Sequence, residues 1–128
     1  MPLARIDLAQ GKSPEYRRTI GDVVYEAVVS ELKAPEGDRF QVITEHSAGG
    51  IIADPSYLGI KRTSDVVFIQ VTMNAGRTLD QKKSFYKRIV DRLNERLALR
   101  RENVLINLVE VAKENWSFGN GIAQYAEP

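Results

Sequence analysis

Apolar and polar residues follow one another near the start of this chain in a pattern that predicts a strand, a helix and a second strand. Residues 2–8 form a short apolar segment typical of a buried strand. Ser13 can cap a helix that begins at Pro14, since the first helical position needs no N–H group. The apolar side chains of this helix recur at helical spacing: Tyr16, Ile20, Val23, Val24, Ala27, Val28 and Leu32. After a break at residues 34–37, the alternating residues 39–45 indicate a strand covered on one face.

The same three elements are predicted again later in the chain. Residues 65–73 are rich in β-branched side chains, which favour a strand, and Thr78 is placed to cap a following helix. The apolar stripe of that helix comprises Leu79, Tyr86, Ile89, Val90, Leu93 and Leu97. Residues 104–111 supply a returning strand.

The two units match each other without a gap when the chain is shifted by 65 residues. This shift aligns residues 11–13 (Gly-Lys-Ser) with residues 76–78 (Gly-Arg-Thr). Parallel strands joined by a right-handed helical crossover, formed twice, predict an α/β (α+β) fold with a four-stranded mixed sheet and both helices on one face. The repeats span about residues 2–46 and 67–111, and a C-terminal segment, 112–128, follows them.

Chain length and the uncovered sheet face set expectations for size and assembly. At 128 residues we expect one domain, residues 1–128, with a core of its own. Two helices on one face leave the other face of the sheet apolar and open, and such surfaces are usually buried between chains. We therefore expect a symmetric homo-oligomer, most simply a homotrimer.

Composition removes several classes of function. Eighteen Lys and Arg against 17 Asp and Glu leave a net charge of +1, which offers no basic field for nucleic acid or for an anionic membrane. The chain has no cysteine and one histidine, so we expect no metal site and no thiol chemistry. No apolar run reaches the length of a signal peptide or a membrane span, and we expect a cytoplasmic protein.

Four segments, in this order along the chain, carry a resemblance to a known family. They are Met1-Pro2-Leu3, Gly37-Asp38-Arg39-Phe40-Gln41, Leu58-Gly59-Ile60-Lys61-Arg62-Thr63 and Asn115-Trp116-Ser117-Phe118-Gly119-Asn120-Gly121. Over nearly its whole length the chain resembles the tautomerase superfamily, and these segments are most similar to its malonate semialdehyde decarboxylase branch. The resemblance implies a cofactor-independent enzyme built from β-α-β units, which begins with proline once Met1 is removed.

Pro2 is the leading candidate for the acid/base group. A free α-amine has a reference pKa of about 7.7–8.0, and burial on a strand lowers the pKa of an amine by disfavouring its charged form. A neutral amine can then take a proton from an enol or from a carbon beside a carbonyl. The alternative is structural, since proline also suits the start of an edge strand, where no N–H is needed.

Asp38 and Arg77 are the next candidates. The resemblance implies that Asp38 is catalytic and helps polarise a carbonyl or steer a proton; otherwise it is a loop aspartate that accepts bonds from turn N–H groups. Arg77 stands one residue before a predicted helix cap, where a guanidinium and a helix N-terminus can bind a substrate carboxylate together. The related decarboxylases carry a pair of arginines here, whereas this chain has one, so Arg77 favours a tautomerase over a decarboxylase. A solvated surface arginine is the competing interpretation.

Four further residues are predicted to bind substrate. Lys61 and Arg62 lie in the loop between the units and can supply positive charge from a neighbouring subunit, or they form a solvated basic turn. Trp116 and Phe118 can build an apolar wall that keeps water from the amine, and they can also pack against the core or a partner.

The sequence thus leads to one preferred function and two alternatives. The preferred function is keto–enol tautomerisation of a small 2-oxo or 3-oxo acid, with Pro2 as the general base and acid. The first alternative is decarboxylation of malonate semialdehyde, which needs the Pro2 nitrogen protonated or as an iminium. The second is a noncatalytic oligomeric module that binds small molecules, for which Pro2 has no role.

Overall fold

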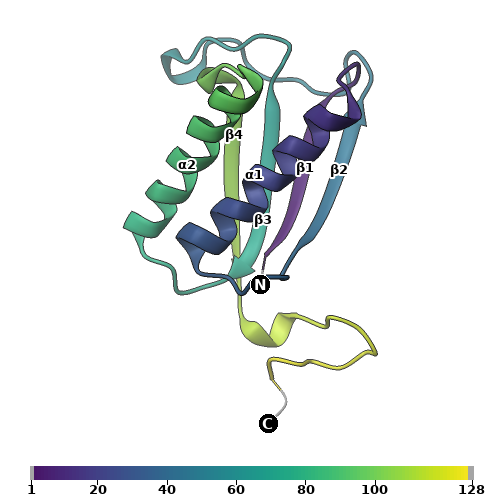
Figure 1. The fold of residues 1–128 in the computed structure, drawn as a ribbon, viewed down its shortest axis with the longest axis vertical. Coiled ribbons are helices and arrows are strands. Elements are labelled where there is room, and N and C mark those ends of the chain that lie inside the picture. Colours follow the sequence, from purple (N-terminus) through teal and green to yellow (C-terminus); the bar gives the residue numbers. More distant parts are fainter. Residues whose placement is uncertain (1, 127–128) are drawn as a thin grey trace.

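The chain folds into the two predicted strand–helix–strand units, with short helical turns in its connections (Figure 1). The computed structural model describes residues 2–126. The bounds are β1 Leu3–Ala9, α1 Pro14–Leu32, β2 Phe40–His46, β3 Val67–Asn74, α2 Leu79–Leu97 and β4 Val104–Val111. Among the described residues, no helix is long and apolar enough to cross a membrane.

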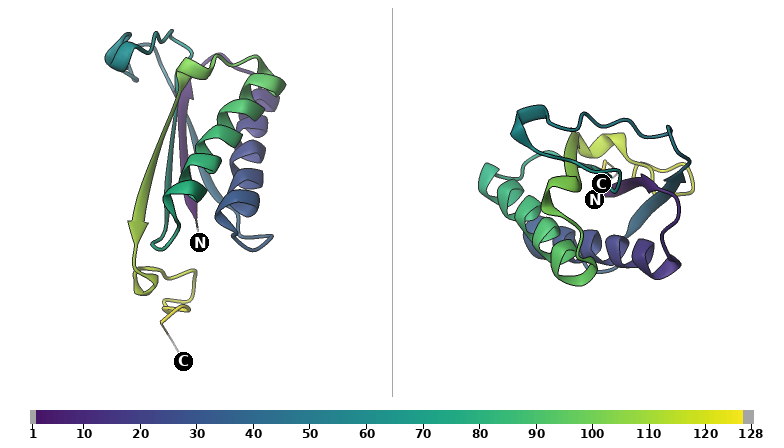
Figure 2. Two further views of the ribbon diagram at one scale, coloured as in Figure 1. Left: turned by 90° about the vertical axis from the view of Figure 1, so that its left-hand side faces the viewer. Right: turned by 90° about the horizontal axis from the view of Figure 1, so that it is seen from above.

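The strands form one mixed sheet in the order β2-β1-β3-β4. β1 pairs with β2 in parallel and β3 pairs with β4 in parallel, while β1 and β3 run antiparallel at the centre. Ile6 of β1 lies opposite both Ile43 of β2 and Ile69 of β3. Both helices pack on the same face of this sheet (Figure 2, left). The predicted four-stranded mixed sheet with two helices on one face is confirmed.

Both helices begin where the sequence predicts. Ser13 caps α1, its Oγ accepting a hydrogen bond from the backbone N–H of Tyr16 at 3.1 Å. At α2 the Thr78 hydroxyl accepts from the N–H of Gln81, and the Gln81 side chain accepts in return from the N–H of Thr78. This reciprocal pair is a capping box, which satisfies two N–H groups that the helix itself leaves unpaired.

The core lies between the helices and the sheet, and α2 contributes to it differently from the prediction. Phe85, Ile89 and Leu93 are fully buried and follow one another at intervals of four residues. The predicted stripe omitted Phe85 and was wrong at Leu79, which is 65% exposed. Leu79 is the first helical residue, and helical side chains lean toward the N-terminus, so it points past the end of the core.

The other face of the sheet lacks any helical cover. Since Ala4, Ile6 and Leu8 of β1 point into the core, the alternate positions of the sheet face away from the helices. Apolar residues at these positions on the two outer strands remain 37–47% exposed, namely Phe40, Val42, Leu105 and Val109.

Candidate active site

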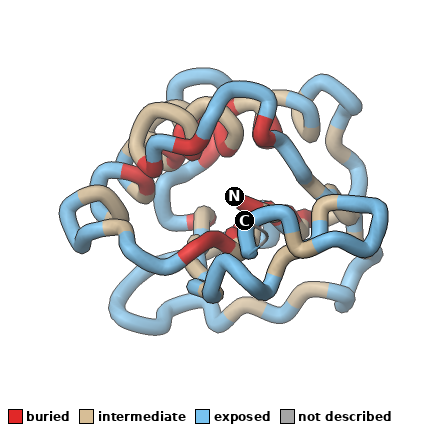
Figure 3. The backbone as a smooth tube through the Cα atoms, turned by 90° about the horizontal axis from the view of Figure 1, so that it is seen from below, coloured by how far each residue is buried: buried red, intermediate tan, exposed pale blue. Residues whose placement is uncertain are grey.

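Pro2 lies at one end of the sheet, where β1 begins and where the C-terminal segment folds beneath the strands (Figure 1). Figure 3 views this end directly, with the N-terminus near the middle of the molecule and buried backbone around it. Pro2 is itself buried. It lines a small cavity of about 10 Å³ together with Ala4, Val24, Tyr25, Val28, Asp38, Arg39, Phe40 and Gln41.

Asp38 is brought to Pro2 by the turn that leads into β2. The Asp38 N–H donates to the carbonyl of Pro35 at 3.2 Å, and Gly37 adopts φ +85°, a left-handed conformation that favours glycine. The Asp38 side chain is buried, with 7% exposure for the residue. Burial raises the pKa of this carboxyl, while the positive charges of the amino terminus and of Arg77 act in the opposite direction.

Arg77 reaches the same end of the sheet from the turn between β3 and α2. Its Nε donates to the carbonyl of Leu32 at 3.1 Å, and its Nη1 donates to the carbonyl of Asn74 at 2.9 Å. The two bonds fix the guanidinium between the end of α1 and the end of β3. From there its charge acts on Asp38, which lines the cavity at Pro2, so the three predicted catalytic residues lie at the same end of the sheet.

Trp116 and Phe118, the residues predicted to form an apolar wall, pack against each other in the C-terminal segment. The indole ring of Trp116 stacks on Phe118 with ring centroids 5.3 Å apart, and Phe118 packs against Phe40 at 6.1 Å. The Trp116 Nε1 group donates to the Oδ1 atom of Asn74 at 2.7 Å and so ties the wall to the end of β3. Since Phe40 also lines the cavity at Pro2, the wall is continuous with that cavity.

The sequence analysis missed two polar side chains of this site. Asn74 is 8% exposed and joins the site through its backbone carbonyl to Arg77 and through its side chain to Trp116. Tyr125 lies with its ring edge against Phe118 at 5.2 Å. Burial raises the pKa of Tyr125, the charge of Asp38 raises it further, and Arg77 lowers it. The sequence shows that Asn74 directly follows a predicted strand, but it does not show that Asn74 is buried. Nothing in the sequence singled out Tyr125.

Lys61 and Arg62 lie at the opposite end of the sheet within this chain. The Arg62 Nη1 group points back into its own loop and donates to the carbonyls of Asp54, Tyr57 and Ile60 at 3.2–3.3 Å. Lys61 is exposed beside it. The folded chain therefore does not bring either residue to its own Pro2.

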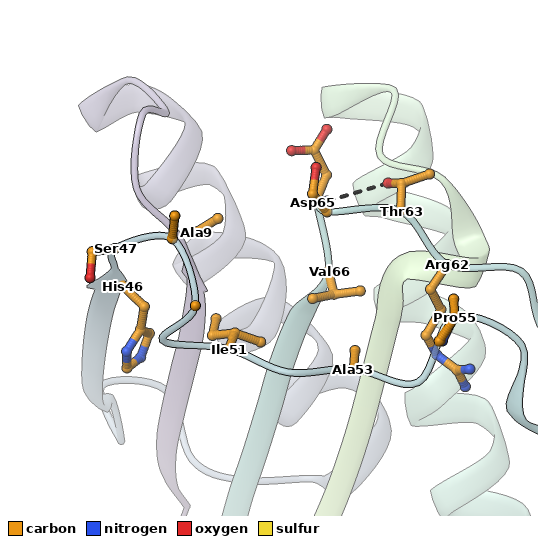
Figure 4. Close-up of a pocket in the computed structure, with 13 residues that line it drawn as sticks. Ala9, His46, Ser47, Ile51, Ala53, Pro55, Arg62, Thr63, Asp65 and Val66 are labelled. Carbon is orange, nitrogen blue, oxygen red and sulfur yellow. Dashed lines mark hydrogen bonds between the residues drawn. The ribbon is translucent and has the colours of Figure 1, made fainter.

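A larger cavity, of about 520 Å³, lies at this opposite end (Figure 4). Three of its polar side chains are already engaged: Arg62 donates to loop carbonyls, Asp65 pairs with Lys12 at 3.1 Å, and the His46 Nε2 atom lies 2.6 Å from the Asp7 Oδ1 atom. This cavity is much larger than the one at Pro2, but neither Pro2 nor Asp38 lines it. We therefore place the candidate active site at Pro2.

The arrangement at Pro2 suits proton transfer on a small acid. A nitrogen at a buried strand start provides a base once it is a free amine, and Asp38 can hold or steer a proton beside it. Arg77 offers N–H donors that match a carboxylate. The rings of Trp116 and Phe118 place apolar surface beside this group of polar side chains.

Comparison with protein families finds matches across most of the chain. Two family models, each described as "Tautomerase enzyme", match residues 38–119 and residues 2–61. Two curated proteins of Bacillus subtilis (strain 168) are also similar. The chain is 36% identical to Probable tautomerase YusQ over 99% of this chain and 100% of that protein. It is 32% identical to Probable tautomerase YrdN over 98% of this chain and 96% of that protein.

Solved structures give the same picture. The chain superposes on FG41 malonate semialdehyde decarboxylase inhibited by 3-bromopropiolate with a TM-score of 0.90, at 40% identity over 98% of this chain and 99% of that one. A second malonate semialdehyde decarboxylase, described for its decarboxylase and hydratase activities, has a TM-score of 0.89 at 30% identity, over 96% of this chain and 95% of that one. A fused 4-OT symmetric trimer, at 20% identity and a TM-score of 0.79 over 98% of this chain and 99% of that one, shares the fold.

Proposed function

This chain belongs to the tautomerase superfamily, in its malonate semialdehyde decarboxylase-like branch, and from this premise we propose that it interconverts the keto and enol forms of a small 2-oxo or 3-oxo acid. Pro2 acts as general base and acid. The observation that carries the proposal is the burial of Pro2 and Asp38 around one cavity, with the charge of Arg77 acting on Asp38.

The family assignment also decides between an enzyme and a binding module. Curated relatives named as tautomerases and structural neighbours named as decarboxylases match almost the full length of the chain, which makes it an enzyme of the tautomerase or decarboxylase type. The noncatalytic alternative loses its support. The two catalytic alternatives differ in the bond that breaks and in the protonation of Pro2.

The proposed tautomerisation moves one proton through Pro2. The amine takes the proton from the enol oxygen, the carbonyl forms, and the ammonium returns a proton to the adjacent carbon. The pyrrolidine ring fixes the direction of the nitrogen lone pair during both steps. This chemistry needs the chain from which Met1 has been removed, because an amide nitrogen at Pro2 has no basicity.

Arg77 binds the substrate carboxylate in this proposal. Its Nε and one N–H of Nη1 hold it to backbone carbonyls, and a guanidinium carries further N–H donors that can reach a carboxylate. Asp38 polarises the substrate carbonyl through a shared proton, a role for which its raised pKa suits it. Trp116 and Phe118 cover the reacting carbons.

Decarboxylation of malonate semialdehyde is the second candidate, favoured by the 40% identity to a decarboxylase of that name. In that reaction the bond to the carboxylate carbon breaks, its electron pair moves toward the aldehyde carbonyl, and protonated Pro2 or an iminium accepts the charge. The carbon left behind then takes a proton. Tautomerisation gains rate as Pro2 loses its proton, whereas decarboxylation assisted by protonated Pro2 loses rate, so opposite pH dependence separates these two reactions. An iminium route starts from the neutral amine and is recognised by trapping the iminium with a hydride donor.

We propose that the active form is a homotrimer whose interface covers the open sheet face. Phe40, Val42, Leu105 and Val109 give that face the exposed apolar surface that a chain-to-chain contact buries. Since Lys61 and Arg62 do not reach Pro2 within one chain, their predicted contact with substrate requires a neighbouring subunit. The Arg62 guanidinium already donates to carbonyls of its own loop, so Lys61 is the better candidate for contact with the substrate of a neighbouring subunit.

Arg77→Ala tests the substrate class. Loss of a charge-assisted contact to a carboxylate amounts to about 1.5–3 kcal/mol, so we expect KM for an arylpyruvate enol to rise about 10- to 100-fold in a continuous tautomerisation assay. Lys12, which occupies the equivalent position in the first unit and pairs with Asp65 at 3.1 Å, supplies the control. Lys12→Ala should keep the wild-type KM; an unchanged KM in Arg77→Ala would remove Arg77 from the binding site.

A further inference from the structure

The turn that carries Asp38 is attached to α1 by a side chain that the proposed mechanism does not use. The Tyr25 hydroxyl oxygen accepts a hydrogen bond from the backbone N–H of Gly37 at 2.8 Å. Gly37 immediately precedes Asp38, so this bond acts one residue from the catalytic carboxylate. Tyr25 also lines the cavity that Asp38 shares with Pro2.

The residue after Asp38 is held by the same part of α1. The Arg39 guanidinium lies over the ring of Tyr25, with its Cζ 5.1 Å from the ring centroid. Its Nη2 atom is 2.8 Å from the Oδ1 atom of Asp22, one helical turn before Tyr25. Asp38 is therefore flanked on both sides by residues fixed to one side chain of the helix.

The start of β2 lies close to the surface of α1 at Gly21. The Gln41 side chain donates to the carbonyl of Gly21 at 2.8 Å. A Cβ atom at Gly21 would lie 2.7 Å from the Gln41 Oε1 atom, so the end of the Gln41 side chain would have to shift, and 3.2 Å from the Arg39 Nη2 atom. Glycine at position 21 accommodates this contact without such a shift.

We propose that Tyr25 is a positioning residue that holds the turn at residues 35–38 so that the Asp38 carboxylate stays in the cavity beside Pro2. The proposal rests on the function assigned to Asp38 above. Tyr25 acts on Asp38 through the N–H of Gly37 and through the stacked Arg39. Without the hydroxyl, the turn keeps its own hydrogen bond between Asp38 and Pro35 but loses the hydrogen bond that ties Gly37 to α1.

Tyr25→Phe removes the hydroxyl and keeps the ring under Arg39. The control is Tyr16→Phe, which removes a hydroxyl from the same helix near Lys12, at the other end of the sheet. For each protein we would follow the Asp38 carboxyl through a pH titration by ¹³C NMR and measure kcat and KM for the arylpyruvate enol. In Tyr25→Phe a loosened turn exposes Asp38 to water, so its pKa falls toward that of a solvated aspartate.

We expect kcat of Tyr25→Phe to drop about tenfold with KM nearly unchanged, because a displaced catalytic group lowers the rate more than it weakens binding. Tyr16→Phe should match the wild type in both readouts. An Asp38 titration that is the same in Tyr25→Phe and the wild type would overturn the proposal. If the wild type failed to tautomerise the substrate, the proposed function would fall, while the titration would still decide whether Tyr25 positions Asp38.

Discussion

Pro2→Ala should reduce tautomerisation of an arylpyruvate enol by about 10²-fold or more, the effect expected when the group that transfers the proton is lost or misdirected. Alanine leaves a primary amine that can rotate, whereas the proline ring holds the nitrogen in one direction on the buried start of β1. The measurement is kcat/KM for the two proteins side by side, after mass spectrometry has established that Met1 is absent from both.

Leu3→Ala provides the matched control for Pro2→Ala. It changes the next residue of β1, whose alternate side chains point away from the core, and it leaves the amine intact. We expect at least half of the wild-type activity to remain. Equal activity in Pro2→Ala and the wild type would exclude Pro2 as the proton carrier.

Asp38→Asn is expected to have an effect of similar size, a loss of about 10²-fold in kcat. Asparagine keeps the shape of the side chain but can neither hold nor release a proton at the pH of the assay. KM should change little, since Arg77 binds the carboxylate in the proposed site. A variant with wild-type kcat would reduce Asp38 to a structural residue of the turn.

Asp38→Asn should also change how the melting temperature depends on pH, in a direction that follows from the burial of Asp38. The pKa of Asp38 is raised in the folded chain, so the folded state favours the protonated carboxyl. That contribution is fully present below the ordinary aspartate pKa of about 3.9 and is lost as the pH rises through the folded-state value. The melting temperature of Asp38→Asn minus that of the wild type should therefore be larger at pH 7 than at pH 3. The opposite trend would mean that ionised Asp38 stabilises the fold.

The helices and the residues at which they begin were predictable from interactions between residues that are close in the sequence. Ser13 with Pro14, and Thr78 in the equivalent position of the second unit, cap their helices through side-chain bonds that depend only on near neighbours. The repeat of the strand–helix–strand pattern then predicted the sheet, because parallel strands joined by right-handed crossovers allow few arrangements.

The phase of the second helix was harder to predict, since it depends on packing against a sheet that the sequence does not display. The predicted stripe shares Ile89 and Leu93 with the buried line, and its Tyr86 and Leu97 pack against the core. It differs in including the exposed Leu79 and in omitting the fully buried Phe85. Phe85 and Tyr86 are neighbours on the helix surface, and only the position of the sheet decides which of the two is fully buried.

The meeting of Pro2 and Asp38 at one edge of the sheet was predictable from the strands, whereas Trp116 and Phe118 were suggested by the family resemblance and the places of Lys61 and Tyr125 were not predictable. Pro2 and Asp38 begin parallel neighbouring strands, whose starts must meet at one edge of the sheet. Lys61 belongs to the connection between the units, which crosses at the other end, and the sequence does not reveal that separation. Tyr125 reaches the site through the fold of the C-terminal segment, which lacks periodic structure.

If a free Pro2 amine carries the proton, its nitrogen must titrate over the pH range in which the activity changes. With ¹⁵N-labelled proline and Met1 removed, we would follow the Pro2 nitrogen by NMR across the pH range over which tautomerisation is measured. We predict one titration below the ordinary α-amino pKa of about 7.7–8.0, with kcat/KM rising over the same pH interval as the amine loses its proton. A Pro2 nitrogen that does not titrate, or that titrates at a pH where the activity stays constant, would show that Pro2 is not the proton carrier.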